Sequence, residues 1–260
     1  MKKFFSIYKT CVITAVARAL TYRLNFVLSM FITLCFNAFF PLVTILIYRA
    51  GANFPGWNIY EVLLMQSVFT LSNGIAGIMF SGVMWRTLLH IREGSFEVVL
   101  LRPVNPLFFL IASNFDPEIA GLIIGGGALF AFSIAHTGIV SLAAIPQFLF
   151  LFLGGFAVMA GMQMIMAATS FKWVGNSRIP EIFDSIMNFG KYPVTIFPKA
   201  IKSIVTFVIP VGMIGFFPAS ALLGRIEPAA LFAVIPCVLF MLLGIWLYQY
   251  MVKLYEGVGG

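Results

Sequence analysis

The side chains that could carry catalysis or hold a metal are few in this sequence and far apart. His90 and His136 lie in segments expected at opposite membrane faces, so they cannot share a metal ion. Cys11, Cys35 and Cys237 lie within apolar stretches, without CxxC or Cys/His spacing, which indicates small core residues. No GxxxxGK[ST] loop for ATP, no HExxH and no GxSxG occurs. We therefore expect no catalytic residue, no metal and no cofactor bound by this chain.

One stretch has the residue types of a docking surface. Residues 86–106, RTLLHIREGSFEVVLLRPVNP, interleave apolar side chains that need burial with charged ones that can make contacts. The stretch predicts a short helix at 88–102, followed by an exit bounded by prolines, that docks into a groove on a partner. The alternative is a helix that lies in the membrane interface and contacts only lipid.

The elements that must position this stretch follow from the composition. The chain has 260 residues, of which 61% are hydrophobic and 10% charged, with a mean hydropathy of +1.03. A soluble domain has about 25% charged residues, so a soluble protein, a disordered chain and a nucleic-acid-binding domain are excluded. One membrane crossing uses about 20 apolar residues. Six such runs predict an all-α polytopic membrane protein: Leu24–Tyr48, Tyr60–Trp85, Ile119–His136, Pro146–Ser170, Ala200–Phe217 and Ala229–Met251.

The chain before the first run predicts a different element. In residues 1–23, polar side chains recur on one side at helical spacing, from Lys3 through Thr10 and Arg18, and apolar ones on the other. This pattern is typical of an amphipathic helix lying in the membrane interface. A cleaved signal peptide is the alternative, because AVA at 15–17 imitates a cleavage site. We expect residues 24–256 to form the six-helix transmembrane domain.

The charges predict the orientation. Fourteen of the 16 basic residues fall in 1–23, 86–118, 171–202 and the C-terminal tail, and only Arg49 and Arg225 fall on the other side. The positive-inside rule then places both termini in the cytoplasm. The six runs hold almost no ionisable residue, which argues against proton or sodium coupling. Their polar residues predict interhelical hydrogen bonds, with contact to substrate as the alternative: Asn25, Asn37, Gln66, Asn73 and Gln163.

The sequence resembles the ABC-2-type exporter permeases. REGSFEVVLLRPVNPL, from Arg92, is similar to their G-x-(L/F)-(D/E)-x-x-L-L-(R)-P segment. KYPVTIFPKAIKSIVTFVIPVGMIGFFPASALLG, from Lys191, is similar to their segment around the fifth span, and the N-terminal helix to their elbow helix. The resemblance extends over essentially the whole chain.

What this resemblance implies is a six-helix permease subunit in the bacterial inner membrane. It would pair with a second permease, identical or related, contact membrane lipids, and bind separate ABC ATPase subunits that hold ATP and Mg²⁺. The segment between the second and third spans would be the coupling helix, which contacts the ATPase through Ile91, Arg92, Glu93, Gly94, Phe96, Glu97, Leu101 and Arg102. The substrate path would run along the first, second and fifth spans, at Asn37, Phe40, Gln66, Asn73, Phe207 and Met213.

Four functions are weighed against one another. The leading hypothesis is a permease subunit of an ATP-driven exporter for small hydrophobic or drug-like compounds. The others are a stand-alone channel or secondary transporter, a membrane-embedded enzyme, and a structural membrane subunit without a transport path. A membrane-embedded enzyme would need catalytic residues on one face, and the sequence shows no such group. Short external loops imply no lid of the kind that some lipid and polysaccharide exporters use, which leaves the substrate class open.

Overall fold

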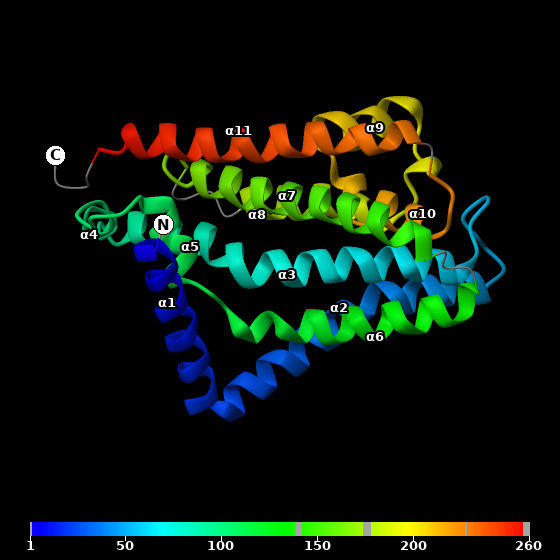
Figure 1. Cartoon of the computed structure of the whole chain (residues 1–260), viewed down its shortest axis with the longest axis horizontal. Helices are drawn as coiled ribbons and strands as arrows, with labels where there is room; N and C mark the ends of the chain where they lie inside the picture. Colours follow the sequence, from blue (N-terminus) through cyan, green and yellow to red (C-terminus); the bar gives the residue numbers. More distant parts are fainter. Residues whose placement is uncertain (1, 139–141, 174–177, 227, 257–260) are drawn as a thin grey trace.

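The fold is an all-α bundle, seen in a computed structural model that describes residues 2–138, 142–173, 178–226 and 228–256 (Figure 1). The long helices are α2 (Arg23–Arg49), α3 (Ile59–Arg92), α6 (Ala120–Thr137), α7 (Ile145–Thr169) and α11 (Val234–Lys253). Among the described residues, six helices are long and apolar enough to cross a membrane: these five and α1 (Lys2–Thr21). The protein is therefore an α-helical polytopic membrane protein.

α1 differs from the other five in its direction. Figure 1 shows it running across the bundle, next to the end where both chain termini lie, whereas α3, α7 and α11 run along the bundle. Its hydrophobic side chains Phe5 and Leu20 are largely exposed, and only Ala15 and Ala19 are buried. This arrangement agrees with a helix that lies in the membrane interface. α1 ends at Thr21, and α2 begins two residues later.

α3 is the central helix of the bundle, and its sequence explains where it begins and ends. Asn58 and Glu61 form a capping box: Tyr60 N donates to Asn58 Oδ1 at 3.3 Å, and Asn58 N donates to Glu61 Oε2 at 2.8 Å. The helix stops at Arg92 because the next turn includes Gly94, whose φ of +67° is a left-handed conformation suited to glycine. α3 packs against α6 on one side and α7 on the other.

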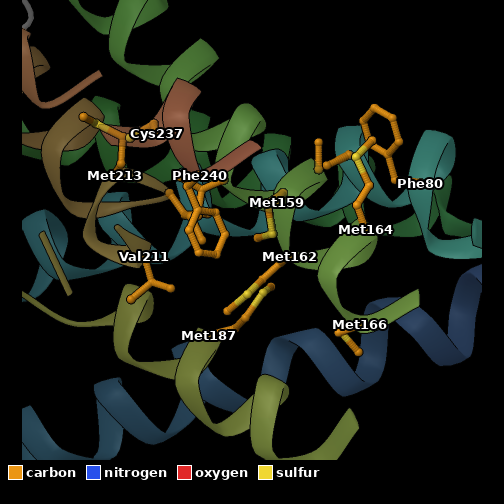
Figure 2. Packing of buried hydrophobic residues seen from close by; sticks show 14 of the residues in the cluster. Phe80, Met159, Met162, Met164, Met166, Met187, Val211, Met213, Cys237 and Phe240 are labelled. Carbon is orange, nitrogen blue, oxygen red and sulfur yellow. The ribbon is translucent and has the colours of Figure 1, made fainter. Parts of the chain in front are cut away.

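The buried core around α7 is rich in methionine. Figure 2 shows Met159, Met162, Met164 and Met166 of α7 among residues of α3 and α11. Flexible thioether side chains fill irregular space between helices whose backbones are held at fixed distances. Two glycines set the distance between α7 and α11: a Cβ on Gly244 would lie 2.7 Å from the Gly161 carbonyl oxygen. Close approach at small residues is a common way for membrane helices to pack.

The predicted fifth span, Ala200–Phe217, is wrong. That region consists of α9 (Lys199–Ser203), a π-helical turn (Ile204–Val208), a 3₁₀ turn (Val211–Met213) and α10 (Phe216–Leu222), with a bend of 73°. Both limbs end at the side of the bundle away from the termini, where Thr195 bonds to Trp57, just before α3, and Arg225 pairs with Glu61 in the first turn of α3. The tip packs deeper, since Ser72 Oγ donates to the Ile214 carbonyl at 3.2 Å. The segment is therefore a re-entrant hairpin, which enters and leaves on one side.

The fifth crossing lies earlier in the chain. α8 (Arg178–Asn188) begins beside the last turns of α3, where Ile179 and Glu181 share a cavity with Trp85 and Arg92. Short 3₁₀ turns at Phe189–Lys191 and Val194–Ile196 continue it to Thr195 at the opposite end. Charged side chains and prolines lower the hydropathy of this crossing, so the composition of the chain does not reveal it.

This correction changes the charge grouping but leaves the number of crossings unaltered. Lys191, Lys199 and Lys202 are not at the end that carries the termini: Lys191 lies within the fifth crossing, and the other two lie on the re-entrant hairpin. The expectation that the spans hold almost no ionisable residue does not apply to the fifth crossing, which carries Glu181, Asp184 and Lys191.

Candidate functional site

The segment predicted as one helix at 88–102 consists of three parts. Ile91 and Arg92 end α3, residues 93–95 form a turn, and α4 covers only Phe96–Leu100. Ser95 braces the turn: its Oγ lies 2.8 Å from His90 Nδ1, and its N–H donates to the His90 carbonyl at 2.8 Å. The predicted helix at 88–102 is therefore interrupted, because Gly94 turns the chain between the end of α3 and the short α4.

α4 is held against the protein by an aromatic cluster. Phe96 is 0% exposed, and its ring makes edge contacts with Phe171 at 5.0 Å and Tyr255 at 5.1 Å. Phe171 also contacts Tyr248, whose hydroxyl lies 3.2 Å from Thr87 Oγ1. Rings from α4, from the end of α7 and from the C-terminal segment thus meet in one cluster, which fixes the position of α4 relative to three helices.

The predicted contact residues separate into two groups. Ile91 and Phe96 are buried, so they anchor the segment and offer no surface to a partner. Leu101 is 84% exposed, and Val98, three residues earlier in the chain, is also exposed. Five other predicted residues lie in the turn or on the outer side of the segment: Arg92, Glu93, Gly94, Glu97 and Arg102. The exposed Glu93, Glu97, Val98 and Leu101 form what we call the α4 surface.

The predicted path residues do not form one site. Met213 is buried at the tip of the re-entrant hairpin, and Phe207 is 64% exposed on the limb that precedes the tip. Gln66 is buried, and its Nε2 donates to Thr44 Oγ1 at 2.8 Å, so it joins α3 to α2. Asn73 lies farther along α3 and is half-buried. Asn37 lines a separate cavity between α2 and α6.

Phe40 lies next to Lys191, which the charge pattern predicts on the cytoplasmic side. Lys191 Nζ lies 3.5 Å from the Phe40 ring centroid and 5.3 Å from that of Phe69. Such contacts with aromatic faces are favourable for an ammonium group that has lost water. Asp184, two helical turns earlier, interacts with Lys191 electrostatically. The fifth crossing therefore brings the Lys191 ammonium between Phe40 of α2 and Phe69 of α3.

These charges belong to a polar face of the crossing. Its members recur every three or four residues and are exposed or half-buried: Glu181, Asp184, Ser185, Asn188 and Lys191. The other side packs inward through Phe183, Met187 and Gly190. A polar face at membrane depth must contact water or another polar protein surface, because lipid chains offer no hydrogen bonds. The three-to-four spacing within 181–191 is the sequence signal that could have identified this face.

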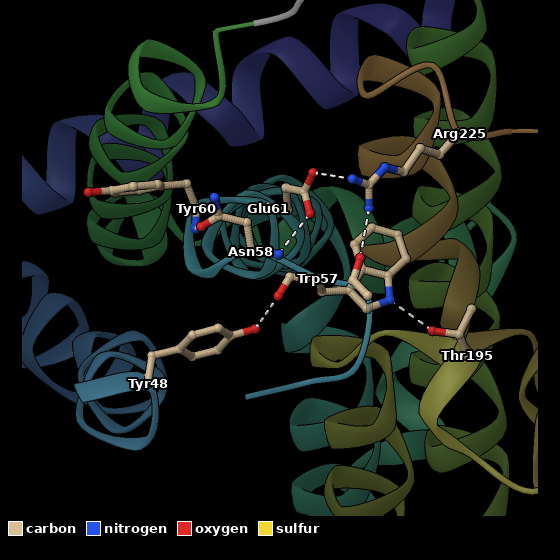
Figure 3. A network of polar contacts seen from close by, with 8 residues as sticks. Tyr48, Trp57, Asn58, Tyr60, Glu61, Thr195 and Arg225 are labelled. Carbon is tan, nitrogen blue, oxygen red and sulfur yellow. Dashed lines mark hydrogen bonds and ion pairs between the residues drawn. The ribbon is translucent and has the colours of Figure 1, made fainter. Parts of the chain in front are cut away.

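A polar network closes the end of the bundle that lies away from the chain termini (Figure 3). Arg225 Nη2 lies 2.6 Å from Glu61 Oε1, and its guanidinium lies over the Trp57 ring at 4.9 Å. Trp57 Nε1 donates to Thr195 Oγ1 at 2.9 Å, and Tyr48 donates from its hydroxyl to the Trp57 carbonyl at 2.8 Å. Both limbs of the re-entrant hairpin are thereby tied to the loop between α2 and α3.

The described part of the chain contains no group of three or more His, Cys, Asp or Glu side chains that could hold a metal. His90 and His136 lie at opposite ends of the bundle: His136 stacks on Tyr60 near the start of α3, and His90 is near the end of that helix.

These features define a multi-pass α-helical membrane protein with an exposed α4 surface at one end and a polar face along one crossing. The chain belongs to the ABC-2 transporter family: the family described as ABC-2 family transporter protein matches residues 15–259. It is thus a permease subunit of an ABC transporter, and the family implies an ATPase partner. No curated protein and no solved structure matches the chain.

Proposed function

We propose that this chain is the permease subunit of an ATP-driven exporter that moves small hydrophobic or drug-like compounds out of the cytoplasm or the inner leaflet. Separate ATPase subunits would bind ATP and Mg²⁺, and a second permease, identical or related, would complete the membrane part. The termini and the α4 surface would face the cytoplasm of a bacterial cell.

The observation that carries this proposal is the α4 surface. A coupling element must be fixed to the helices it moves and must also expose side chains to the ATPase. Phe96 provides the attachment through Phe171 and Tyr255, whereas Val98 and Leu101 are exposed beside Glu97. Apolar side chains next to charges are suited to a groove on a protein partner.

A mechanism follows from this attachment. ATP binding closes the ATPase pair, and the motion reaches the permease as a push on α4. Because the aromatic cluster joins α4 to α3, α7 and α11, the push displaces helices as rigid bodies. The substrate path lies along the polar face of the fifth crossing, between the two permeases. The network of Arg225 and Glu61 closes the far end until the helices move.

Leu101→Glu tests the coupling role. We expect at least a tenfold weaker association with the ATPase, about 1.4 kcal/mol, because a charge replaces the most exposed apolar side chain of the α4 surface. The measurements are co-purification of the ATPase and ATP hydrolysis by the assembly. Leu101→Met is the control, since it keeps an apolar side chain of similar size. Wild-type association in the Glu variant would contradict the role.

Ser185→Cys tests the path. In a chain whose three native cysteines are replaced, we expect a membrane-impermeant thiol reagent to label Cys at 185 in the assembled transporter at least tenfold faster than Cys at 182. Ser185 lies on the polar face, whereas Ile182 is an apolar residue, 57% exposed, off that face. Mass spectrometry of the labelled chain gives both rates. Labelling at 185 as slow as at 182 would mean that the polar face does not contact water, and equally fast labelling at both positions would mean that water is not confined to that face; either result contradicts the path.

The second candidate function is a stand-alone channel or secondary transporter. The charges of the fifth crossing favour it, because Asp184 and Lys191 lie at membrane depth. It predicts substrate movement in liposomes that contain this chain without any ATPase. Transport that depends on an added ATPase and ATP supports the exporter instead.

A further inference from the structure

A cavity of about 330 Å³ lies between α2 and α6, away from the polar face of the fifth crossing. Its wall is apolar except for Asn37 of α2 and Thr70 of α3. It has the size of a small-molecule site, since such sites begin at about 300 Å³, and the ~150 Å³ cavity of an engineered protein already holds benzene.

Small residues explain why the space is unfilled. α2 and α6 touch at Gly121, where an added Cβ would lie 2.5 Å from the Met30 carbonyl oxygen. Beyond this contact the facing side chains are small, with Ala38 on α2 and Gly125 and Ala128 on α6. The Gly121 contact therefore holds the helices at a fixed separation, and the small residues beside it leave part of the space between them unfilled.

The polar part of the wall offers acceptors. Asn37 Nδ2 donates to the Thr33 carbonyl at 2.9 Å, which fixes the amide so that Oδ1 is the remaining acceptor, and no donor to it occurs among the described residues. Pro41 has no N–H to donate to the Asn37 carbonyl. Thr70 uses its hydroxyl proton on the Gln66 carbonyl at 2.8 Å and keeps its lone pairs. One Nδ2–H of Asn37 remains, against three acceptors without a donor: Asn37 Oδ1, the Asn37 carbonyl and Thr70 Oγ1. The partner that this wall lacks most is therefore a hydrogen-bond donor.

We propose that this cavity binds an apolar compound of about two rings that carries one hydrogen-bond donor, taken up sideways from the bilayer and held at Asn37. A lipid acyl chain has the apolar character but no donor. Binding rests on the cavity alone, and its use as a substrate intake site rests on the proposed function.

The test uses the purified permease in nanodiscs, without an ATPase, and three probes at equal probe-to-lipid ratios. 4-Phenylphenol has two rings and a donor, biphenyl has the rings alone, and dodecane imitates a lipid chain. We expect 4-phenylphenol to raise the unfolding temperature the most. An equal effect of biphenyl overturns recognition at Asn37, and an equal effect of dodecane identifies a lipid groove and overturns the proposal.

Four variants locate the binding. Ala128→Leu fills the cavity and should weaken 4-phenylphenol binding at least tenfold, and Gly125→Ala is a milder variant whose added methyl meets Leu34 at an ordinary 3.5 Å. Asn37→Leu should reduce the effect of 4-phenylphenol to that of biphenyl. Ala131→Leu, at an exposed position of α6 outside the cavity, should change nothing. Unchanged binding in both cavity-filling variants overturns the proposal, whatever the result for ATPase association.

Discussion

Phe96→Ala is expected to lower the free energy of unfolding by about 3–5 kcal/mol, as for other fully buried phenylalanines. Phe96 is 0% exposed, and the truncation would leave a void between Phe171 and Tyr255. The same variant should also reduce stimulation of the ATPase, because α4 would lose its attachment to the bundle. Thermal unfolding of the purified permease and ATP hydrolysis by the assembly give the two quantities.

Val98→Ala is the matched control on the same short helix. Val98 is 54% exposed, so its truncation should change stability by no more than about 0.5 kcal/mol. If Phe96→Ala left stability at the wild-type value, the aromatic cluster would not be what holds α4. Phe96 would then have to act as a contact for the ATPase, as the family resemblance implies.

Gly155→Ala is expected to destabilise the protein by about 1–3 kcal/mol through overpacking at the seat of the re-entrant hairpin. An added Cβ would lie 2.7 Å from the Met213 carbonyl oxygen and 2.9 Å from Ile214 Cα. Both are backbone atoms, so the hairpin tip must move as a unit. Thermal unfolding measures the loss, and we expect transport to fall with it, because the displaced tip packs on α3 and α7.

Gly127→Ala is the control, and it should raise stability where Gly155→Ala lowers it. A Cβ at Gly127 of α6 meets nothing within 4 Å. Alanine in a helix interior is more stable than glycine by about 0.5–1 kcal/mol, so this variant should unfold at a higher temperature. If both variants shifted stability in the same direction, the close approach of the hairpin to α7 would not be the cause.

Four crossings could be predicted from the sequence because each is an apolar run long enough to cross the membrane. The predicted spans Leu24–Tyr48, Ile119–His136, Pro146–Ser170 and Ala229–Met251 agree closely with α2, α6, α7 and α11. The second span was placed correctly at its start, but α3 continues to Arg92, because a helix does not stop where its side chains leave the hydrocarbon layer.

The fifth crossing could not be read in this way. Hydropathy measures the average preference of a segment for lipid, and it ranks 200–217 above 178–196. The polar face of α8 is stable at membrane depth only because its other face packs on the bundle, and a hairpin as apolar as 199–222 turns back only because α3 and α7 receive its tip. Both are properties of contacts between distant segments.

The sequence by itself determined that the protein is a polytopic α-helical membrane protein, since 61% of its residues are hydrophobic and they fall in separate runs long enough to cross a membrane. It also marked 86–106 as a distinctive segment. Only the tertiary structure decided which of those side chains face outward: Phe96 and Leu101 are both apolar, yet one is buried against the rings of Phe171 and Tyr255 and the other is 84% exposed. The physical reason is that residue type fixes the preference for burial, while the partners that bury Phe96 are Phe171 and Tyr255, far away in the chain.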